Sequence, residues 1–193
     1  MKLIFATNNR HKINEVQKLL DSNFSIVSPA DLGCTDDIPE NEPTLEGNAS
    51  EKARYIWNKF HLPCFADDTG LEVEALNGAP GVYSARYAGE NKSADENNAK
   101  LIAELWGKTN RNARFRCVIA LIIDGKEQLF EGIIQGEILN EWAGSEGFGY
   151  DPLFRPKGYN CSFAKMTMDE KNSISHRGIA VKKLSDYLNA LRP

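Results

Sequence analysis

Residues 2–12, KLIFATNNRHK, have the pattern of a buried strand that runs into a polar junction and then into a helix. The helix is indicated by Ile13, Val16 and Leu20, which recur at helical spacing. A helix start leaves its first N–H groups unpaired and carries partial positive charge, so this junction could hold a polyphosphate. An ordinary capped helix is the alternative, because the glycines and the Lys-Ser/Thr pair of a Walker loop are missing. The candidate phosphate ligands are Thr7, Asn8, Asn9, Arg10, His11 and Lys12.

Size and composition favour one α/β domain over residues 1–193. The chain is 41% hydrophobic and 26% charged, which is typical of globular proteins with a sizeable core. No repeat or linker divides it. The net charge of −4 argues against a protein that binds nucleic acid by neutralising its phosphates. We therefore expect a small-molecule partner.

The cysteines and the N-terminus favour a reducing, cytoplasmic location. Cys34, Cys64, Cys117 and Cys161 are widely spaced and form no C-x-x-C pair, so we expect them to be reduced and buried. No apolar run approaches the length of a membrane span, and the N-terminus lacks the features of a signal peptide. No membrane partner is expected.

Periodicity predicts the remaining elements. Strands are expected at 25–28, 62–66, 71–76, 113–123 and 128–139, with the last two joined as a hairpin by Asp124-Gly125. Residues 29–43 are expected to form a loop, and helices are expected after Thr44 and after Ser93. The last helix is predicted to bury Ala180, Leu184, Tyr187, Leu188 and Leu191.

An acidic pair follows the predicted strand 62–66. Asp67 and Asp68 precede Thr69-Gly70, where we expect a turn at the mouth of a cleft. Neighbouring residues of an extended chain point to opposite faces, so the two acids should have different roles. Two aspartates that cap a turn are the alternative. The Asp-Thr-Gly triplet also occurs in aspartic proteases, but with one copy here only a symmetric dimer could complete that site.

Acidic residues upstream could complete a magnesium site. Mg²⁺ takes oxygen ligands and commonly uses one or two carboxylates together with substrate phosphates. One glutamate of the acidic loop, Glu40 or Glu42, would therefore suffice beside Asp68. For Glu46 we favour a solvated position near a helix start.

A nucleobase site is predicted nearer the C-terminus. Phe148, Gly149, Tyr150 and Asp151 place two rings and one carboxylate together, which suits stacking on a planar base while the carboxylate contacts its edge. Lys171, His176 and Arg177 follow at the expected start of the last helix and could bind a phosphate or the carbonyl edge of a base. A polar helix cap with an exposed arginine is the alternative.

Together these motifs resemble the inosine triphosphate pyrophosphatase family, and within it the bacterial non-canonical purine nucleoside triphosphate pyrophosphatases. The resemblance rests on residues 7–12, 66–71, 78–87, 147–152 and 175–178, in the family's order. It implies elongated, two-lobed α/β subunits with a mixed central sheet flanked by helices. It also implies an active-site cleft between the lobes and a homodimer.

The resemblance further implies hydrolysis of ITP, dITP and XTP to the monophosphate and pyrophosphate, which removes deaminated purines from the nucleotide pool. Asp68 would be the catalytic carboxylate and would share Mg²⁺ with Glu40. Relatives often carry Glu-Thr-Gly where this chain has Glu40-Asn41-Glu42, so Glu42 is the other candidate ligand, and Lys165 stands where relatives often have an acid. The triphosphate would contact residues 7–12, Lys52 and Lys171, the substrate would touch Thr69, and the base would contact residues 148–151, His176 and Arg177.

Two other functions are compatible with these residues. A nucleotide sensor would bind a triphosphate without cleaving it. A pyrophosphatase of the related Maf type would act on other modified nucleotides. The segment Ser175-His176-Arg177 favours purines.

Overall fold

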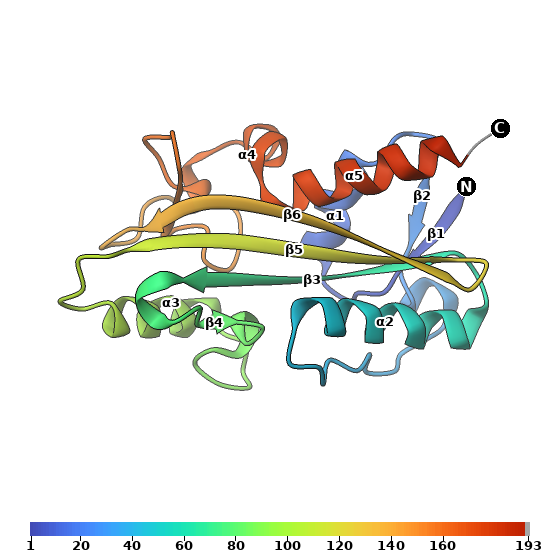
Figure 1. Cartoon of the computed structure of the whole chain (residues 1–193), viewed down its shortest axis with the longest axis horizontal. Helices are drawn as coiled ribbons and strands as arrows, with labels where there is room; N and C mark the ends of the chain where they lie inside the picture. The colour runs from blue at the N-terminus through green and yellow to red at the C-terminus, as the bar shows by residue number, and fades with distance from the viewer. Residues whose placement is uncertain (192–193) are drawn as a thin grey trace. The chain divides into compact units, whose positions relative to one another are not determined.

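A mixed sheet forms the centre of the computed structural model, which describes residues 1–191 (Figure 1). Its strands are β1 (Lys2–Phe5), β2 (Ser25–Val27), β3 (Cys64–Val73), β4 (Pro80–Gly81), β5 (Asn112–Ile123), β6 (Lys126–Ile138) and β7 (Phe154–Pro156). The α-helices are α1 (Arg10–Leu19), α2 (Leu45–Phe60), α3 (Ala94–Glu104), α4 (Met168–Ile174) and α5 (His176–Ala190).

The strand order is β2-β1-β3-β5-β6-β7, and β4 also pairs with β3. β1 runs parallel to both β2 and β3, whereas the β3–β4 and β6–β7 pairs are antiparallel. This arrangement confirms the predicted α/β class with a mixed central sheet.

The chain forms two compact units, each built from separate stretches of sequence. The first unit contains residues 1–68 and 117–132 and the chain from 177, and the second contains residues 69–116 and 133–176. β3, β5 and β6 are each divided between the two units. Asp68 and Thr69 are therefore consecutive in one strand but belong to different units.

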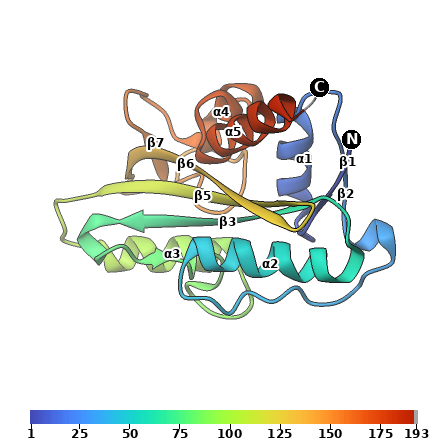
Figure 2. The ribbon, with the colours of Figure 1, turned by 45° about the vertical axis from the view of Figure 1, so that its right-hand side comes forward.

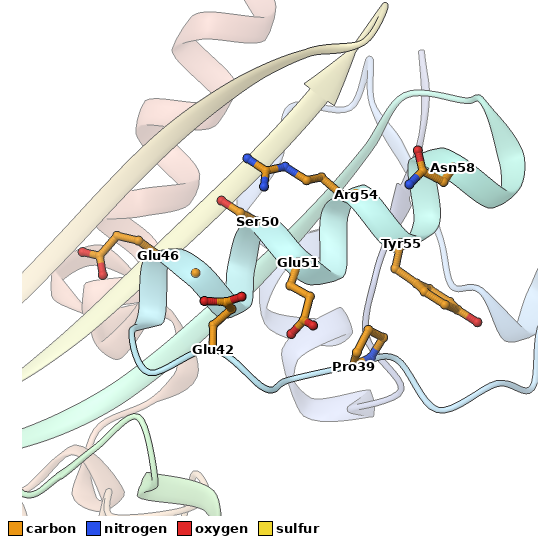
Figure 3. A pocket seen from close by; sticks show the side chains of 9 residues that line it. Pro39, Glu42, Glu46, Ser50, Glu51, Arg54, Tyr55 and Asn58 are labelled. Carbon is orange, nitrogen blue, oxygen red and sulfur yellow. The ribbon is translucent and has the colours of Figure 1, made fainter.

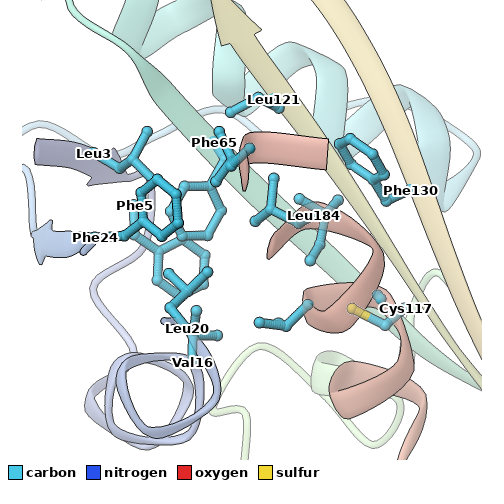
Figure 4. Packing of buried hydrophobic residues seen from close by; sticks show 14 residues of the cluster. Leu3, Phe5, Val16, Leu20, Phe24, Phe65, Cys117, Leu121, Phe130 and Leu184 are labelled. Atoms are coloured by element: carbon cyan, nitrogen blue, oxygen red, sulfur yellow. The ribbon is translucent and has the colours of Figure 1, made fainter. Parts of the chain in front are cut away.

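The core of the first unit gathers side chains from β1, α1, β3, β5 and α5 (Figure 4). The rings of Phe5 and Phe65 stack at its centre, with centroids 4.4 Å apart. In Figures 1 and 2, α1 and α5 lie on one side of this part of the sheet and α2 lies on the other. Each face of the first unit's strands is therefore covered.

The second unit has its own aromatic core. Phe115 contacts Phe154 edge-on with ring centroids 4.7 Å apart, and Phe163 packs beside both rings. Leu71, Val73 and Leu101 are buried in the same cluster. The second unit therefore has its own hydrophobic core, which supports the polar residues of that unit.

Several local predictions are confirmed. Asp124 and Gly125 both have positive φ, as a two-residue hairpin turn requires, and they join β5 to β6. Thr44 caps α2 by accepting a hydrogen bond from the Gly47 N–H, and Ser93 caps α3.

Two predictions are wrong. Residues 62–66 and 71–76 do not form separate strands, because β3 is continuous through the expected turn. Tyr187 in α5 and Leu191 just after it have side chains that are 37% and 53% exposed, whereas Ala180, Leu184 and Leu188 are buried as expected. The apolar face of α5 is narrower than the sequence pattern indicates.

All four cysteines are free thiols, as expected. Cys34, Cys64 and Cys117 are buried, and burial raises the pKa of Cys64 to about 12. Cys161 is partly exposed, so the expected burial is wrong at that position. Among residues 1–191, none of the helices has the length and apolar composition that crossing a bilayer requires.

The packing at the C-terminus predicts a contrast between Leu184 in α5 and Leu191, which lies just after that helix. Leu184→Ala should lower the free energy of unfolding by about 2–5 kcal/mol, because Leu184 is fully buried in the core of the first unit. Leu191→Ala, the matched control, should change it by less than about 0.5 kcal/mol. Urea denaturation measures both values, and equal losses would contradict this packing.

Candidate functional site

The junction after β1 forms a capped helix start. Asn9 caps α1, and its Oδ1 accepts hydrogen bonds from the N–H groups of His11 and Lys12 at 3.0 and 3.3 Å. Thr7 Oγ1 accepts from the Asn9 N–H. α1 begins at Arg10, so the second half of the predicted junction is helical. Because Asn9 occupies two backbone donors, the side chains rather than the bare helix start carry the charge available to a ligand.

A buried ion network lies on the α1 and α5 side of β3. Lys12 Nζ is 2.8 Å from Asp67 Oδ1, and Arg177 Nε is 3.3 Å from Asp67 Oδ2. Arg177 Nη1 also donates to Glu15 Oε2 at 2.5 Å. Arg177 is buried, so the alternative of an exposed arginine cap is wrong.

This network fixes the charge of Asp67. Burial by itself would raise the pKa of Asp67, but Lys12, Arg177 and Lys52 together hold it well below its usual range. Burial would likewise lower the pKa of Arg177, yet Asp67 and Glu15 raise it above its ordinary value. Asp67 is therefore a permanently ionised anchor and is unsuited to accept a proton.

Asp68 meets different partners, from α2 and the loop before it. Asn48 Nδ2 donates to Asp68 Oδ2 at 3.0 Å, and Lys52 Nζ lies 3.6 Å from Asp68 Oδ1. The same ammonium lies 2.5 Å from Glu40 Oε1. The two aspartates thus have separate sets of partners, in agreement with the predicted difference in their roles.

The pKa of Asp68 is shifted in the opposite direction from that of Asp67. Burial raises it, and Lys52, Lys12 and the hydrogen bond from Asn48 oppose that effect only in part. The nearby Glu40 raises it further. A carboxylate with raised proton affinity is the better proton acceptor of the two.

The two candidate metal ligands Glu40 and Glu42 have different surroundings. Glu40 shares Lys52 with Asp68. Glu42 packs against Gly47, where an added Cβ would lie 2.6 Å from the Glu42 Cβ. Glu42 lines a surface hollow along α2 to which neither Glu40 nor Asp68 contributes (Figure 3). The hollow is lined by Pro39, Glu42, Glu46, Gly47, Ser50, Glu51, Arg54, Tyr55 and Asn58.

Glu40 and Asp68 are suited to a hard divalent cation. Both are oxygen donors, and both already contact one shared cation, the Lys52 ammonium. Within residues 1–191 no group of three or more His, Cys, Asp or Glu side chains could hold a metal ion alone. Two carboxylates that leave the remaining positions to phosphate oxygens and water are the usual ligand set of Mg²⁺.

In the second unit, the loop around Asp151 is tightly organised. Asp151 Oδ2 accepts hydrogen bonds from the Phe148 N–H and from Lys171 Nζ, both at 2.8 Å. The Lys171 ammonium lies 4.8 Å from the centre of the Phe148 ring. Gly147 has φ +80°, and a Cβ there would lie 2.2 Å from Asp151 Oδ2, so only glycine fits. An aromatic ring, a carboxylate and a cation are thus brought together.

Two residues of the predicted base site are placed differently from expectation. Tyr150 is buried, and its hydroxyl donates to the Ser84 carbonyl at 2.9 Å, so its ring supports the loop from within the core. Lys171 belongs to α4 rather than to the start of α5. The His176 ring stacks on Phe115 with centroids 4.6 Å apart.

The predicted site residues therefore form two groups. Lys12, Glu40, Lys52, Asp68 and Arg177 gather in the first unit, and Phe148, Gly149, Asp151 and Lys171 gather in the second. Asn8, Arg10 and His11 are exposed, and Thr69 is partly exposed.

Sequence reasoning missed two polar residues that position these groups. Glu15 holds Arg177, and Asn48 holds Asp68. Glu15 lies three residues after Lys12, and Asn48 lies four residues before Lys52. Both therefore share a helix face with a predicted cation, and that spacing was the available signal.

These features define an α/β protein in which lysines, an arginine and carboxylates are clustered in the first unit. The chain belongs to the Ham1 family, which matches residues 3–187. It is 53% identical to the dITP/XTP pyrophosphatase of Flavobacterium psychrophilum, over 97% of this chain and 98% of the relative. It is 55% identical to the protein of the same name from Porphyromonas gingivalis, over 97% of each chain.

Solved structures of the family have the same fold. The Ham1 protein of Staphylococcus aureus is 37% identical and superposes with a TM-score of 0.91 over all of both chains. A HAM1 protein from Coxiella burnetii is 38% identical, with a TM-score of 0.91 over 98% of this chain and 99% of that one.

The buried network predicts a large effect of Glu15 on stability. Glu15→Gln should lower the free energy of unfolding by about 3 kcal/mol, because it removes one charge from a buried ion network. Asp186→Asn breaks an exposed pair with Lys182 and should cost less than about 0.5 kcal/mol. Chemical denaturation of both variants checks this contrast, and similar small losses would show that the Arg177 network contributes little.

Proposed function

We propose that the chain hydrolyses the non-canonical purine nucleoside triphosphates ITP, dITP and XTP to the nucleoside monophosphate and pyrophosphate. One observation carries the proposal. Asp68, Glu40 and Lys52 meet in one cluster, in a chain about half identical over nearly its full length to proteins named dITP/XTP pyrophosphatase. The cellular role is removal of deaminated purines from the nucleotide pool.

The first unit supplies the hydrolytic groups. Lys12 and Lys52, with residues 7–11, bind the triphosphate, and Lys171 of the second unit contributes a further cation. A water oxygen attacks the α-phosphorus, the bond from that phosphorus to the bridging oxygen breaks, and pyrophosphate leaves. Asp68 accepts the proton of the attacking water.

Magnesium completes this chemistry. Glu40 and Asp68 would hold the ion, which would activate water and supply positive charge to neutralise the phosphates. General-base help is commonly worth about 10²–10⁴-fold in rate. Positioning of the triphosphate by the lysines must therefore supply much of the remaining acceleration.

The second unit supplies base recognition. Phe148, which is partly exposed, stacks on the purine, while Asp151 is held in one orientation by Lys171 and by a backbone N–H. His176 of this unit and Arg177, which belongs to the first unit, contact the carbonyl edge of the base in this proposal. Groups that pair with a 6-oxo purine leave the amino group of adenine without a partner, and that mismatch provides discrimination.

The protein also acts as a cytoplasmic homodimer in this proposal. Large apolar side chains are exposed on the second unit, where Tyr83, Trp106, Trp142 and Tyr159 all have at least two fifths of their surface accessible. Exposed aromatic side chains of this kind are common at subunit interfaces. Sedimentation analysis of the purified chain measures the assembly state.

A substrate panel tests the proposed activity. The chain is incubated with ITP, XTP, GTP, ATP and a pyrimidine triphosphate in Mg²⁺, and phosphate products are identified. We expect pyrophosphate, formed fastest from ITP and XTP. Orthophosphate in its place would contradict the cleavage site, and preference for a pyrimidine or another modified nucleotide would favour a Maf-type enzyme. Binding without any cleavage would favour a sensor.

Asp68→Asn is the control for this panel. It should reduce kcat at least 100-fold, about the value of a general base, while the thermal transition stays cooperative. Full turnover in Asp68→Asn would remove this carboxylate from the mechanism.

Glu40→Gln and Glu42→Gln form a matched pair for the metal site. Glu40→Gln should raise the Mg²⁺ concentration for half-maximal activity at least about tenfold, because Glu40 shares a cation with Asp68. Glu42→Gln should leave it unchanged, because Glu42 lines a separate hollow. Mg²⁺ titration of initial rates measures both values, and the reverse result would assign the metal to Glu42.

A further inference from the structure

The loop of residues 147–151 is hydrogen-bonded to α3. Asn98, in the first half of that helix, donates from Nδ2 to the carbonyl oxygen of Gly149 at 2.9 Å. Gly149 has φ +63° and lies between Phe148 and the buried Tyr150. The bond from Asn98 therefore fixes the peptide that follows Gly149, directly beside the proposed stacking ring.

Only one of the two polar atoms of the Asn98 side chain forms a hydrogen bond. Its side chain is 1% exposed, and its Oδ1 has no hydrogen-bond partner among residues 1–191. A buried carbonyl oxygen without a hydrogen-bond donor destabilises a fold. The unpaired Oδ1 of Asn98 therefore costs more stability than the Nδ2 hydrogen bond to Gly149 contributes. Leucine at position 98, which has a similar shape, would remove both the unpaired oxygen and the hydrogen bond to Gly149.

Asn97, the neighbouring residue, is arranged in the opposite way. Its Oδ1 accepts from the Ala88 N–H at 2.6 Å, and its Nδ2 donates to the Ala85 carbonyl at 3.0 Å. Both ends of this buried amide are used, and both hold the segment that follows Ser84 rather than the loop at Gly149. Asn97 has the contacts of a residue that stabilises the fold.

From this asymmetry we infer that Asn98 is a positioning residue for base discrimination, acting through the Gly149 carbonyl. The inference rests on the proposed function, in which residues 148–151 hold the purine. Asn98 keeps Phe148 and Asp151 in the arrangement that suits a 6-oxo purine, and it does so without touching the substrate. Its loss loosens the loop and brings the rates for different bases closer together.

Hydrogen exchange tests the positioning and does not depend on activity. In Asn98→Leu, amides of residues 147–153 should exchange at least about fivefold faster than in the wild-type chain, while the urea midpoint stays level or rises. Asn97→Leu, the matched control, should lower the urea midpoint and leave exchange of residues 147–153 unchanged. Unchanged exchange in Asn98→Leu, or equal acceleration in both variants, would overturn the positioning role.

Kinetics test the specificity. The ratio of kcat/KM for ITP to that for GTP should fall at least about fivefold in Asn98→Leu and should stay within twofold of wild type in Asn97→Leu. Asn98→Ala serves the same purpose if the leucine variant fails to fold. A faster-exchanging loop with an unchanged ratio would overturn the specificity role alone. A wild-type chain that cleaves no nucleotide would contradict the proposed function, while hydrogen exchange would still test the positioning.

Discussion

Two adjacent carboxylates in the middle of a buried strand are the constraint on which the first unit depends. Burying Asp67 and Asp68 is unfavourable unless each is paired, and removal of one partner from such a pair commonly costs about 3–5 kcal/mol. Because neighbouring strand residues point to opposite faces, the partners must come from both sides of the sheet. Lys12 and Arg177 meet Asp67, while Asn48 and Lys52 meet Asp68. Two adjacent strand positions thereby connect α1, α2 and α5.

The same pairing divides the chemistry between the two acids. Asp67 touches two cations and has a lowered pKa, whereas Asp68 lies 3.6 Å from an ammonium, accepts a hydrogen bond from an amide and has a pKa that burial raises. Two identical side chains one residue apart thus differ in charge environment, and in the proposed function one is an ion-pair anchor and the other accepts a proton. Their surroundings, rather than their residue type, set their roles.

The sequence predicts the parts of this structure that local physics determines. Alternation along a strand separates Asp67 from Asp68, the Asp124-Gly125 turn predicts the hairpin, and Thr44 is correctly identified as a helix cap. The continuity of β3 could not be predicted, because Asp-Thr-Gly has the composition of a turn and only tertiary pairing makes it a strand. The burial of Arg177 likewise depends on Glu15, which lies far away in the sequence.

The charge of the first unit's cluster bears on the form in which a nucleotide binds. Lys12, Lys52 and Arg177 give three positive charges, and Glu15, Glu40, Asp67 and Asp68 give four negative charges, so the cluster has a formal charge of −1. In the proposed function, this excess of acid would disfavour a bare triphosphate. A triphosphate that arrives with a divalent cation would bring positive charge for Glu40 and Asp68 to bind. The two carboxylates would therefore favour the metal complex of the nucleotide over the free nucleotide.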